Sequence, residues 1–259
     1  PPAARASKRA SAVPGGLSGA RNRALEHIRG KYILFVDSDD TLRKGAVQAL
    51  LSKAMETNAD IVQGGFVNIT GHGLVFGRTG YREGSVDETG QTPYGMAWGK
   101  VIRSSLFAHL KFPEGYWFED TIFAFCIAPF QPTHYLIPEY VCNYTRNPLG
   151  ITLRSRKKAK AVDTVWIMRY LMAELAQKKE VHSAQVQQLL LQHIALAWYR
   201  LSRLDEAVQQ AAFLVMQQMY AGYYTSQDIF VQDSRLLALH QALTAKSYGQ
   251  YLAAAEKLT

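Results

Sequence analysis

The residues of this sequence that are best suited to chemistry are carboxylates within the segment 31–42 (KYILFVDSDDTL). Asp37, Asp39 and Asp40 follow a short apolar run that predicts a buried strand. Ligand sites in open α/β sheets lie at the carboxyl ends of strands, and carboxylates gathered there repel one another unless a cation lies between them. Such oxygen ligands suit Mg²⁺ or Mn²⁺, which also bind substrate phosphates. One carboxylate would be enough to cap the following helix, so three favour metal or phosphate chemistry.

Several kinds of site could use these carboxylates. A calcium loop is excluded, because the glycine and glutamate that it requires are missing from the necessary positions. The pattern Asp37-x-Asp39-x-Thr41 resembles the nucleophile motif of haloacid-dehalogenase-type phosphatases. That family also needs a later acidic pair for Mg²⁺, and Asp228 and Asp233 have neither its glycine nor its spacing. The phosphatase therefore remains an alternative, but only its nucleophile motif matches this sequence.

A more extended resemblance concerns the segments that flank the carboxylates. Segments 16–22 (GLSGARN) and 30–40 (GKYILFVDSDD) look like family 2 glycosyltransferases. Three further segments resemble that family in the same order: 98–103 (WGKVIR), 112–123 (FPEGYWFEDTIF) and 144–152 (YTRNPLGIT). Each motif is weak alone, but their order over residues 15–153 is specific. The resemblance implies an α/β domain of the A-type glycosyltransferase fold with an Asp-x-Asp metal motif.

The resemblance also implies roles for the acidic residues. Asp37 and Asp39 would hold Mn²⁺ or Mg²⁺, which neutralises charge on a leaving nucleoside diphosphate, and Asp37 would also lie near the donor ribose. Asp120 matches the base that accepts the proton of the acceptor hydroxyl, and Glu119 would position the acceptor or support the base. Family precedent implies inversion by a single displacement. From the sequence alone, Glu119 and Asp120 could equally be first-turn acids of a helix.

Five other residues are expected to bind substrates. Arg21 and Asn22 would contact the donor nucleotide, with bracing of the metal loop or a helix-surface position as alternatives. Arg146 would clamp the donor diphosphate, since a guanidinium suits phosphate oxygens, with an ordinary surface arginine as the alternative. Trp98 would stack on the acceptor sugar, although a large aromatic more often packs in a core. Lys100 is expected on the acceptor side, paired with the acidic residues or with donor phosphates.

The elements that must position these residues follow from the periodicity of apolar residues. Strands are expected at 32–36, 61–67, 135–137 and 140–144; helices at 17–28, 44–57 and 119–128; and turns or a hairpin at 71–84. After about residue 155 the pattern is helical, and one expected buried face comprises Val162, Val165, Trp166, Tyr170 and Ala173. We therefore expect a flexible or non-native leader (1–16), a partial catalytic domain (17–153) and a helical C-terminal subdomain (154–259).

Composition and charge limit the partners and the location. The 259 residues carry 29 Lys and Arg against 21 Asp and Glu, giving a net charge of +8. Two basic clusters, within residues 1–31 and 154–160, favour phosphates or an anionic membrane surface, although solvated segments would explain them equally well. No nucleic-acid-binding motif is recognisable. No apolar run approaches the roughly 18 residues of a spanning helix, and two cysteines suggest a reducing compartment. We expect a cytoplasmic protein with peripheral contact to the inner face of the membrane.

Nothing before Gly15 resembles the nucleotide-binding strands with which family 2 members usually begin. We therefore expect this chain alone to be poorly stable and weakly active or inactive. The expected function is transfer of a sugar from a nucleotide-diphospho-sugar to a saccharide or lipid-linked saccharide hydroxyl, in surface polysaccharide biosynthesis. The alternatives are the phosphatase that uses Asp37, and a non-catalytic remnant that acts as an interaction module through its helical tail.

Overall fold

The structure is a computed structural model that describes residues 15–258 except 92, 94, 109, 128–131, 148–149, 151–157, 178–180, 229–230 and 232. Most of the expected leader, most of the 154–160 basic cluster and part of the 144–152 motif therefore lie outside the described residues. None of the described helices is both long and apolar enough to cross a membrane.

One mixed sheet forms the middle of the molecule. Within the described residues it has seven strands, and its main path runs in the order β1-β6-β3-β7-β2, with β4 beside β3 and β5 beside β7. The strands are β1 (Tyr32–Leu34), β2 (Thr41–Leu42), β3 (Ile61–Ile69), β4 (Val75–Thr79), β5 (Gly84–Ser85), β6 (Lys100–Arg103) and β7 (His134–Thr145). The central β3 pairs in parallel with β7 and antiparallel with β4 and β6. Because β2 pairs with β7, the loop that joins β1 to β2 lies near the end of β7.

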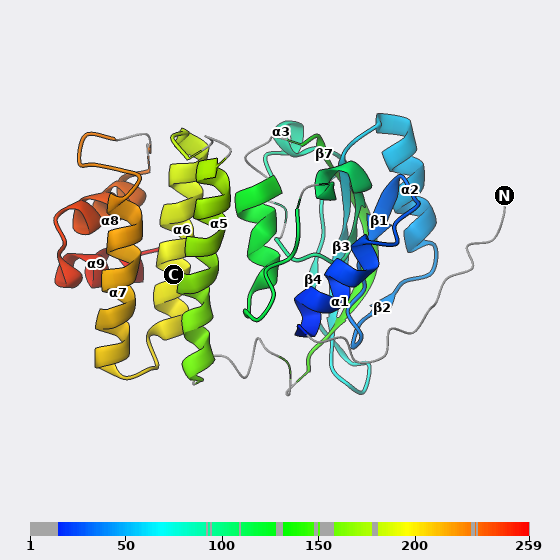
Figure 1. Cartoon of the computed structure of the whole chain (residues 1–259). Coiled ribbons are helices and arrows are strands. Elements are labelled where there is room, and N and C mark those ends of the chain that lie inside the picture. Colours follow the sequence, from blue (N-terminus) through cyan, green and yellow to red (C-terminus); the bar gives the residue numbers. More distant parts are fainter. Residues whose placement is uncertain are drawn as a thin grey trace.

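Each face of the sheet packs against helices (Figure 1). On one face lies α2 (Ala46–Thr57), whose Leu50 packs in a buried cluster with Val62 and Val101. Because side chains alternate along a strand, neighbouring residues of β3 and β6 such as Ile61 and Ile102 point to the opposite face, towards the C-terminal helices.

The remaining α-helices of the described residues lie before, between and after the strands of the sheet. They are α1 (Gly16–Leu25), α3 (Val86–Thr89), α5 (Asp163–Gln177), α6 (Ala184–Leu201), α7 (Glu206–Ala221), α8 (Ser234–Thr244) and α9 (Tyr248–Glu256). Short 3₁₀ turns cover Ser104–Phe107, Glu119–Thr121 and Ala159–Val162. A single apolar cluster joins Ile102 of the sheet to Leu190 of α6 and Tyr251 of α9. The C-terminal helices thus share a core with the sheet.

Several expected elements differ from the observed ones. The helix expected at 119–128 is a 3₁₀ turn at Glu119–Thr121 followed by one π-helical segment at Phe123–Ile127. The two strands expected at 135–137 and 140–144 are one strand, β7. Pro138 does not interrupt it, because the pairing of β7 with β3 shifts register between Gln63 and Gly65.

The expected buried face at the start of the C-terminal region is confirmed for Val165, which is buried on α5, but is wrong for three of its residues. Trp166 is 40% and Tyr170 41% exposed, and Ala173 is also exposed. The helix instead buries residues on its other side, among them Ile167, Met168, Leu171, Met172 and Leu175. Apolar residues occur on both sides of this helix, so periodicity alone could not identify the side that faces the core.

Candidate functional site

Two of the predicted metal ligands lie in the loop between β1 and β2. Asp37 is partly buried, and its Oδ1 accepts a hydrogen bond of 2.9 Å from Nη2 of Arg21. Asp39 is exposed, and its Oδ2 accepts a hydrogen bond of 2.8 Å from Nδ2 of Asn147, just beyond β7. Among the described residues, each of these contacts uses one oxygen of its carboxylate.

The third carboxylate of this loop, Asp40, fastens the loop to the sheet. Its Oδ1 accepts a hydrogen bond of 2.7 Å from the N–H of Thr145, and its Oδ2 is buried without a partner among the described residues. Burial raises the pKa of Asp40 to about 6, although the Thr145 N–H lowers it, and the charges of Asp39 and Asp37 raise it further. Asp40 therefore holds the loop in place at the end of β7.

Arg21 of α1 connects this loop to the second acidic motif. Its Nη1 donates a hydrogen bond of 2.6 Å to Oε1 of Glu119, which lies 98 residues away in the sequence. The guanidinium also lies 5.7 Å from the ring centroid of Phe35 and 5.2 Å from that of Phe112. Arg21 is only 6% exposed, so the helix-surface alternative is wrong. The observed contacts match the bracing alternative and leave the guanidinium engaged with protein carboxylates.

Asn22 holds the segment that leads to the acidic pair. Its Nδ2 donates to the carbonyl of Phe112 at 2.8 Å and to Oε1 of Glu114 at 2.9 Å. Its Oδ1 accepts a hydrogen bond of 2.7 Å from the Phe112 N–H. Because these contacts use both polar groups of the amide, the structure shows Asn22 as a brace and not at an open donor surface.

Glu119 and Asp120 lie in the first turn of the 3₁₀ helix that follows Phe118. Burial raises the pKa of Glu119, the charge of Asp120 raises it further, and Arg21 lowers it. Burial also raises the pKa of Asp120, against the opposing charges of Arg200 and Arg21. The first-turn location agrees with the helix-start alternative, but the bond from Glu119 to Arg21 joins the pair to the loop after β1.

Residues 9–110 match the family described as Glycosyl transferase family 2. Over these residues the chain thus matches a family 2 glycosyltransferase domain. Over 229 residues it is 24% identical to glycosyltransferase GlyA of Streptococcus pneumoniae serotype 4, covering 79% of this chain and 32% of GlyA. Over 122 residues it is 25% identical to glycosyltransferase GlyG of the same organism, covering 41% of this chain and 40% of GlyG. The chain thus spans well under half the length of these relatives.

The fold resembles that of S. aureus TarS residues 1–349, solved in complex with UDP-GlcNAc. The TM-score is 0.71 at 17% sequence identity, covering 94% of this chain and 72% of that one. The expected α/β class, with an A-type glycosyltransferase fold and a helical C-terminal region, is confirmed. The phosphatase alternative is not favoured, because the matched family and both relatives are glycosyltransferases.

Lys100 lies inside the family 2 domain, near Asp120. It is 3% exposed on β6, and its Nζ lies 5.6 Å from the ring centroid of Phe123. Burial lowers the pKa of Lys100 to about 7, and the charge of Asp120 opposes that shift. The effect of the Asp120 charge on Lys100 agrees with the expected pairing of Lys100 with the acidic residues. The burial of Lys100, in contrast, leaves little of its surface for an acceptor.

Trp98 lies just before β6, and Arg146 directly follows β7. Trp98 is 2% exposed and packs in the α2-side core, with its ring centroid 5.0 Å from Phe66 and 5.1 Å from Tyr144. The structure therefore gives Trp98 a packing role and does not support its expected stacking on an acceptor. Arg146 is exposed beyond β7, with its guanidinium 6.0 Å from the ring centroid of Phe76.

The family 2 domain can supply carboxylates to a divalent ion. Among the described residues, no group of three or more His, Cys, Asp or Glu side chains could hold a metal ion. Mg²⁺ needs only one or two carboxylates when waters and substrate phosphates complete its coordination. Asp37 and Asp39 fit this requirement, because their contacts within the described part of the chain use one oxygen of each carboxylate, and the buried Oδ2 of Asp40 lies in the same loop.

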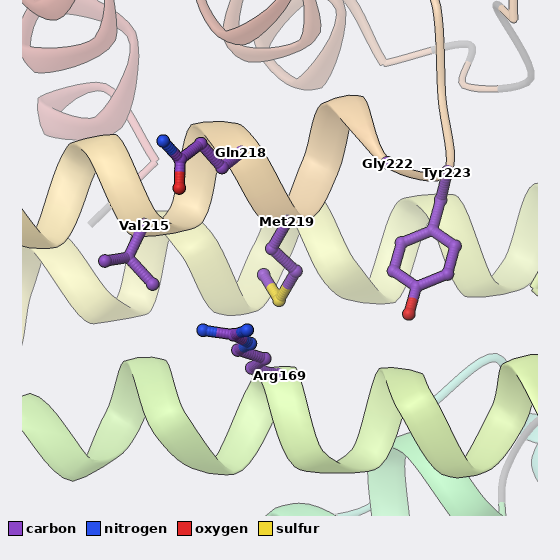
Figure 2. A pocket seen from close by; sticks show the side chains of 6 residues that line it. All are labelled: Arg169, Val215, Gln218, Met219, Gly222 and Tyr223. Carbon is purple, nitrogen blue, oxygen red and sulfur yellow. The ribbon is translucent and has the colours of Figure 1, made fainter.

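A separate cavity of about 300 Å³ lies between α5 and α7 (Figure 2). It is lined by Arg169, Val215, Gln218, Met219, Gly222 and Tyr223. None of the residues expected to do chemistry lines it, so it is distinct from the carboxylate site.

Two contacts of the site were not predicted from the sequence. Asn147 directly follows Arg146 in a motif that was recognised, so its bond to Asp39 had a sequence signal. Arg200 of α6, whose charge acts on Asp120, lies outside every recognised motif, and its position depends on how the helices pack.

Proposed function

We propose that this chain transfers a sugar from a nucleoside-diphospho-sugar to a hydroxyl acceptor. The observation that carries this proposal is the bridge made by Arg21, which contacts Asp37 at 2.9 Å and Glu119 at 2.6 Å. It brings the candidate metal loop and the candidate base to one site beside the sheet. The family match of residues 9–110 supports the same chemistry.

In the proposed reaction, Asp120 accepts the proton of the acceptor hydroxyl as that oxygen attacks the anomeric carbon. The bond from the anomeric carbon to the diphosphate oxygen breaks as the new bond forms on the opposite face, which inverts the configuration. Asp37 and Asp39 would hold Mn²⁺ or Mg²⁺, and the ion, when bound, neutralises charge on the leaving diphosphate. Glu119, fixed by Arg21, supports the position of Asp120.

The proposed donor is a uridine diphospho-sugar. TarS, which shares the fold, has been solved with UDP-GlcNAc and with UDP. Arg146 is proposed to contact the donor diphosphate, because it precedes the residue that binds Asp39 and its side chain is exposed. The proposed acceptor is a saccharide or lipid-linked saccharide hydroxyl, used in surface polysaccharide synthesis. We place this reaction in the cytoplasm, at the inner face of the membrane.

Isothermal titration calorimetry tests the donor site. The chain is titrated with UDP in the presence and absence of Mn²⁺, beside an Asp37→Ala/Asp39→Ala double variant. We expect metal-dependent binding that the double variant loses. Asp87→Ala, which removes an exposed carboxylate from α3, is the matched control and should bind as the parent does. A folded parent chain that binds neither UDP nor another nucleoside diphosphate would contradict the proposal and favour the non-catalytic remnant.

A further inference from the structure

The loop that carries the acidic pair is held from the side of the C-terminal helices as well as by α1. Lys160 Nζ donates to the carbonyl of Gly115 at 2.8 Å and forms an ion pair of 2.8 Å with Asp163. Asp163 Oδ2 in turn accepts a hydrogen bond of 2.8 Å from the N–H of Trp117. The segment 115–117 is therefore anchored to the first residue of α5 and to the 3₁₀ turn that precedes it.

A second contact from the C-terminal helices, made by Arg200, reaches the residue just before the acidic pair. This residue lies in the last turn of α6, and its Cζ is 3.7 Å from the ring centroid of Phe118. Its Nη1 donates a hydrogen bond of 2.8 Å to Oγ1 of Thr164 on α5. Phe118 directly precedes Glu119 and adopts a left-handed backbone conformation with φ of 66°. Such a conformation is unfavourable for a bulky residue and persists where its surroundings hold it.

The contacts of Arg200 differ from those of an ordinary ion pair. Among the described residues, no carboxylate forms a salt bridge with its guanidinium. Its charge acts on Asp120 at longer range, and the two groups shift one another's pKa towards their charged forms. A stacked guanidinium combines a planar contact with a fixed charge, which an apolar side chain of similar size would not provide.

We propose that Arg200 is a positioning residue for the transfer reaction, which it serves by stacking on Phe118 and fixing the loop that presents Asp120. The expected effect of Arg200 on the transfer rate rests on the proposed function, whereas its effect on the position of the loop does not. It assigns the C-terminal helices a part in the catalytic site, because Arg200 reaches Phe118 while anchored to Thr164.

The structural part is tested by hydrogen exchange on the full chain. We expect the amides of residues 117–121 to exchange about tenfold faster in Arg200→Met than in the parent, because the stack on Phe118 is lost. Arg203→Met is the matched control, since Arg203 is exposed three residues further along the chain. It should leave those amides unchanged. Unaltered exchange in Arg200→Met would overturn the inference, whether or not the chain proves to be a transferase.

The kinetic part is tested by UDP release from UDP-N-acetylglucosamine with Mn²⁺. In Arg200→Met we expect kcat to fall about tenfold to hundredfold, because a base displaced by about 1 Å loses that much rate. The KM for the donor should stay within about twofold, because the contacts of Arg200 within the described residues are with Phe118 and Thr164 and not with the residues proposed to bind the donor. Arg200→Lys, which keeps the charge without the planar stack, should recover only part of kcat.

The hydrogen-exchange test and the kinetic test together distinguish failure of the Arg200 inference from failure of the proposed function. Loss of kcat together with a comparable rise in KM and a lowered melting temperature would show a merely structural role and overturn the inference. If the parent chain releases no UDP under these conditions, the proposed function fails for UDP-N-acetylglucosamine as the donor, and hydrogen exchange still decides whether Arg200 holds the loop.

Discussion

Arg21 is the side chain on which the two acidic motifs converge. It is buried between the rings of Phe35 and Phe112, with one nitrogen on Asp37 and another on Glu119. A buried carboxylate that loses its cation keeps the cost of desolvation without the attraction that offset it. The same contact that organises the site is therefore also a source of stability.

The first prediction concerns the free energy of unfolding. Arg21→Met should lower it by about 3 kcal/mol, because Glu119 would be left buried without its cation. Urea unfolding at pH 7, followed by circular dichroism, measures the change. Arg23→Met is the control, since Arg23 is exposed on the same helix and forms an exposed pair with Glu26. Equal effects of the two variants would contradict the role assigned to Arg21.

The second prediction concerns the pH dependence of donor turnover. Burial raises the pKa of Asp120 above its ordinary value of 3.8. Because a base must be deprotonated to act, kcat/KM should fall with decreasing pH, and the midpoint of that fall should lie above pH 3.8. The charged groups around Asp120 are Arg200 on α6, Arg21 on α1, Lys100 on β6, Asp37 and Glu119.

Arg200→Met removes one of the cations that lower the pKa of Asp120. In this variant the fall of kcat/KM on the acid side should therefore occur at a higher pH than in the parent. Profiles of kcat/KM against pH for both proteins measure the shift. If the acid-side fall of kcat/KM stays at the same pH or moves to lower pH, the charge of Arg200 does not act on the base.

At the scale of elements, the sequence predicted what depends on local pattern. The strands at 32–36 and 61–67 and the helix at 44–57 appear as β1, β3 and α2 with similar bounds. The Asp-x-Asp segment and the Glu-Asp segment were also recognisable, because each is a short stretch of sequence.

What the sequence did not predict depends on contacts between distant residues. The stack of Arg200 on Phe118 joins positions that no periodic pattern connects. Trp98 was expected to stack on the acceptor sugar or to pack in a core, and only the structure shows its ring packed against Phe66 of β3 and Tyr144 of β7. The π-helical segment after Thr121 likewise depends on packing against α5 and α6, which the local sequence does not reveal.

The third prediction tests the crowding at the centre of β3. A Cβ added at Gly64 would lie 2.5 Å from Cγ1 of Val141 and 2.8 Å from the carbonyl oxygen of Glu139. Gly64→Ala should therefore lower the free energy of unfolding by about 2 kcal/mol through overpacking between β3 and β7. Gly71→Ala is the control, because a Cβ there would meet no atom within 4 Å. If Gly64→Ala is as stable as that control in urea, the close approach of β7 to β3 is wrong.

The whole molecule is organised around a shared core. The apolar cluster that includes Phe35 and Ile102 beside the sheet continues through Leu190 of α6 to Leu243 of α8. The helices therefore do more than extend the catalytic domain: they complete one side of its core and anchor the loop before Glu119. The basic residue Lys160, expected within a charged cluster that faces an anionic partner, takes part in that anchoring.

The fourth prediction follows from this continuity. If the sheet and the C-terminal helices share a core, they should unfold together, so urea transitions followed by far-ultraviolet circular dichroism and by tryptophan fluorescence should coincide. Leu190→Ala leaves a cavity where α6 meets the core, and it should lower the free energy of unfolding by about 3 kcal/mol with both probes. Leu214→Ala, at a position of α7 that is 57% exposed, is the control and should change little. Two separate transitions, with only the helical one displaced by Leu190→Ala, would show that the helices form an independent unit and would remove the structural basis for their part in positioning Asp120.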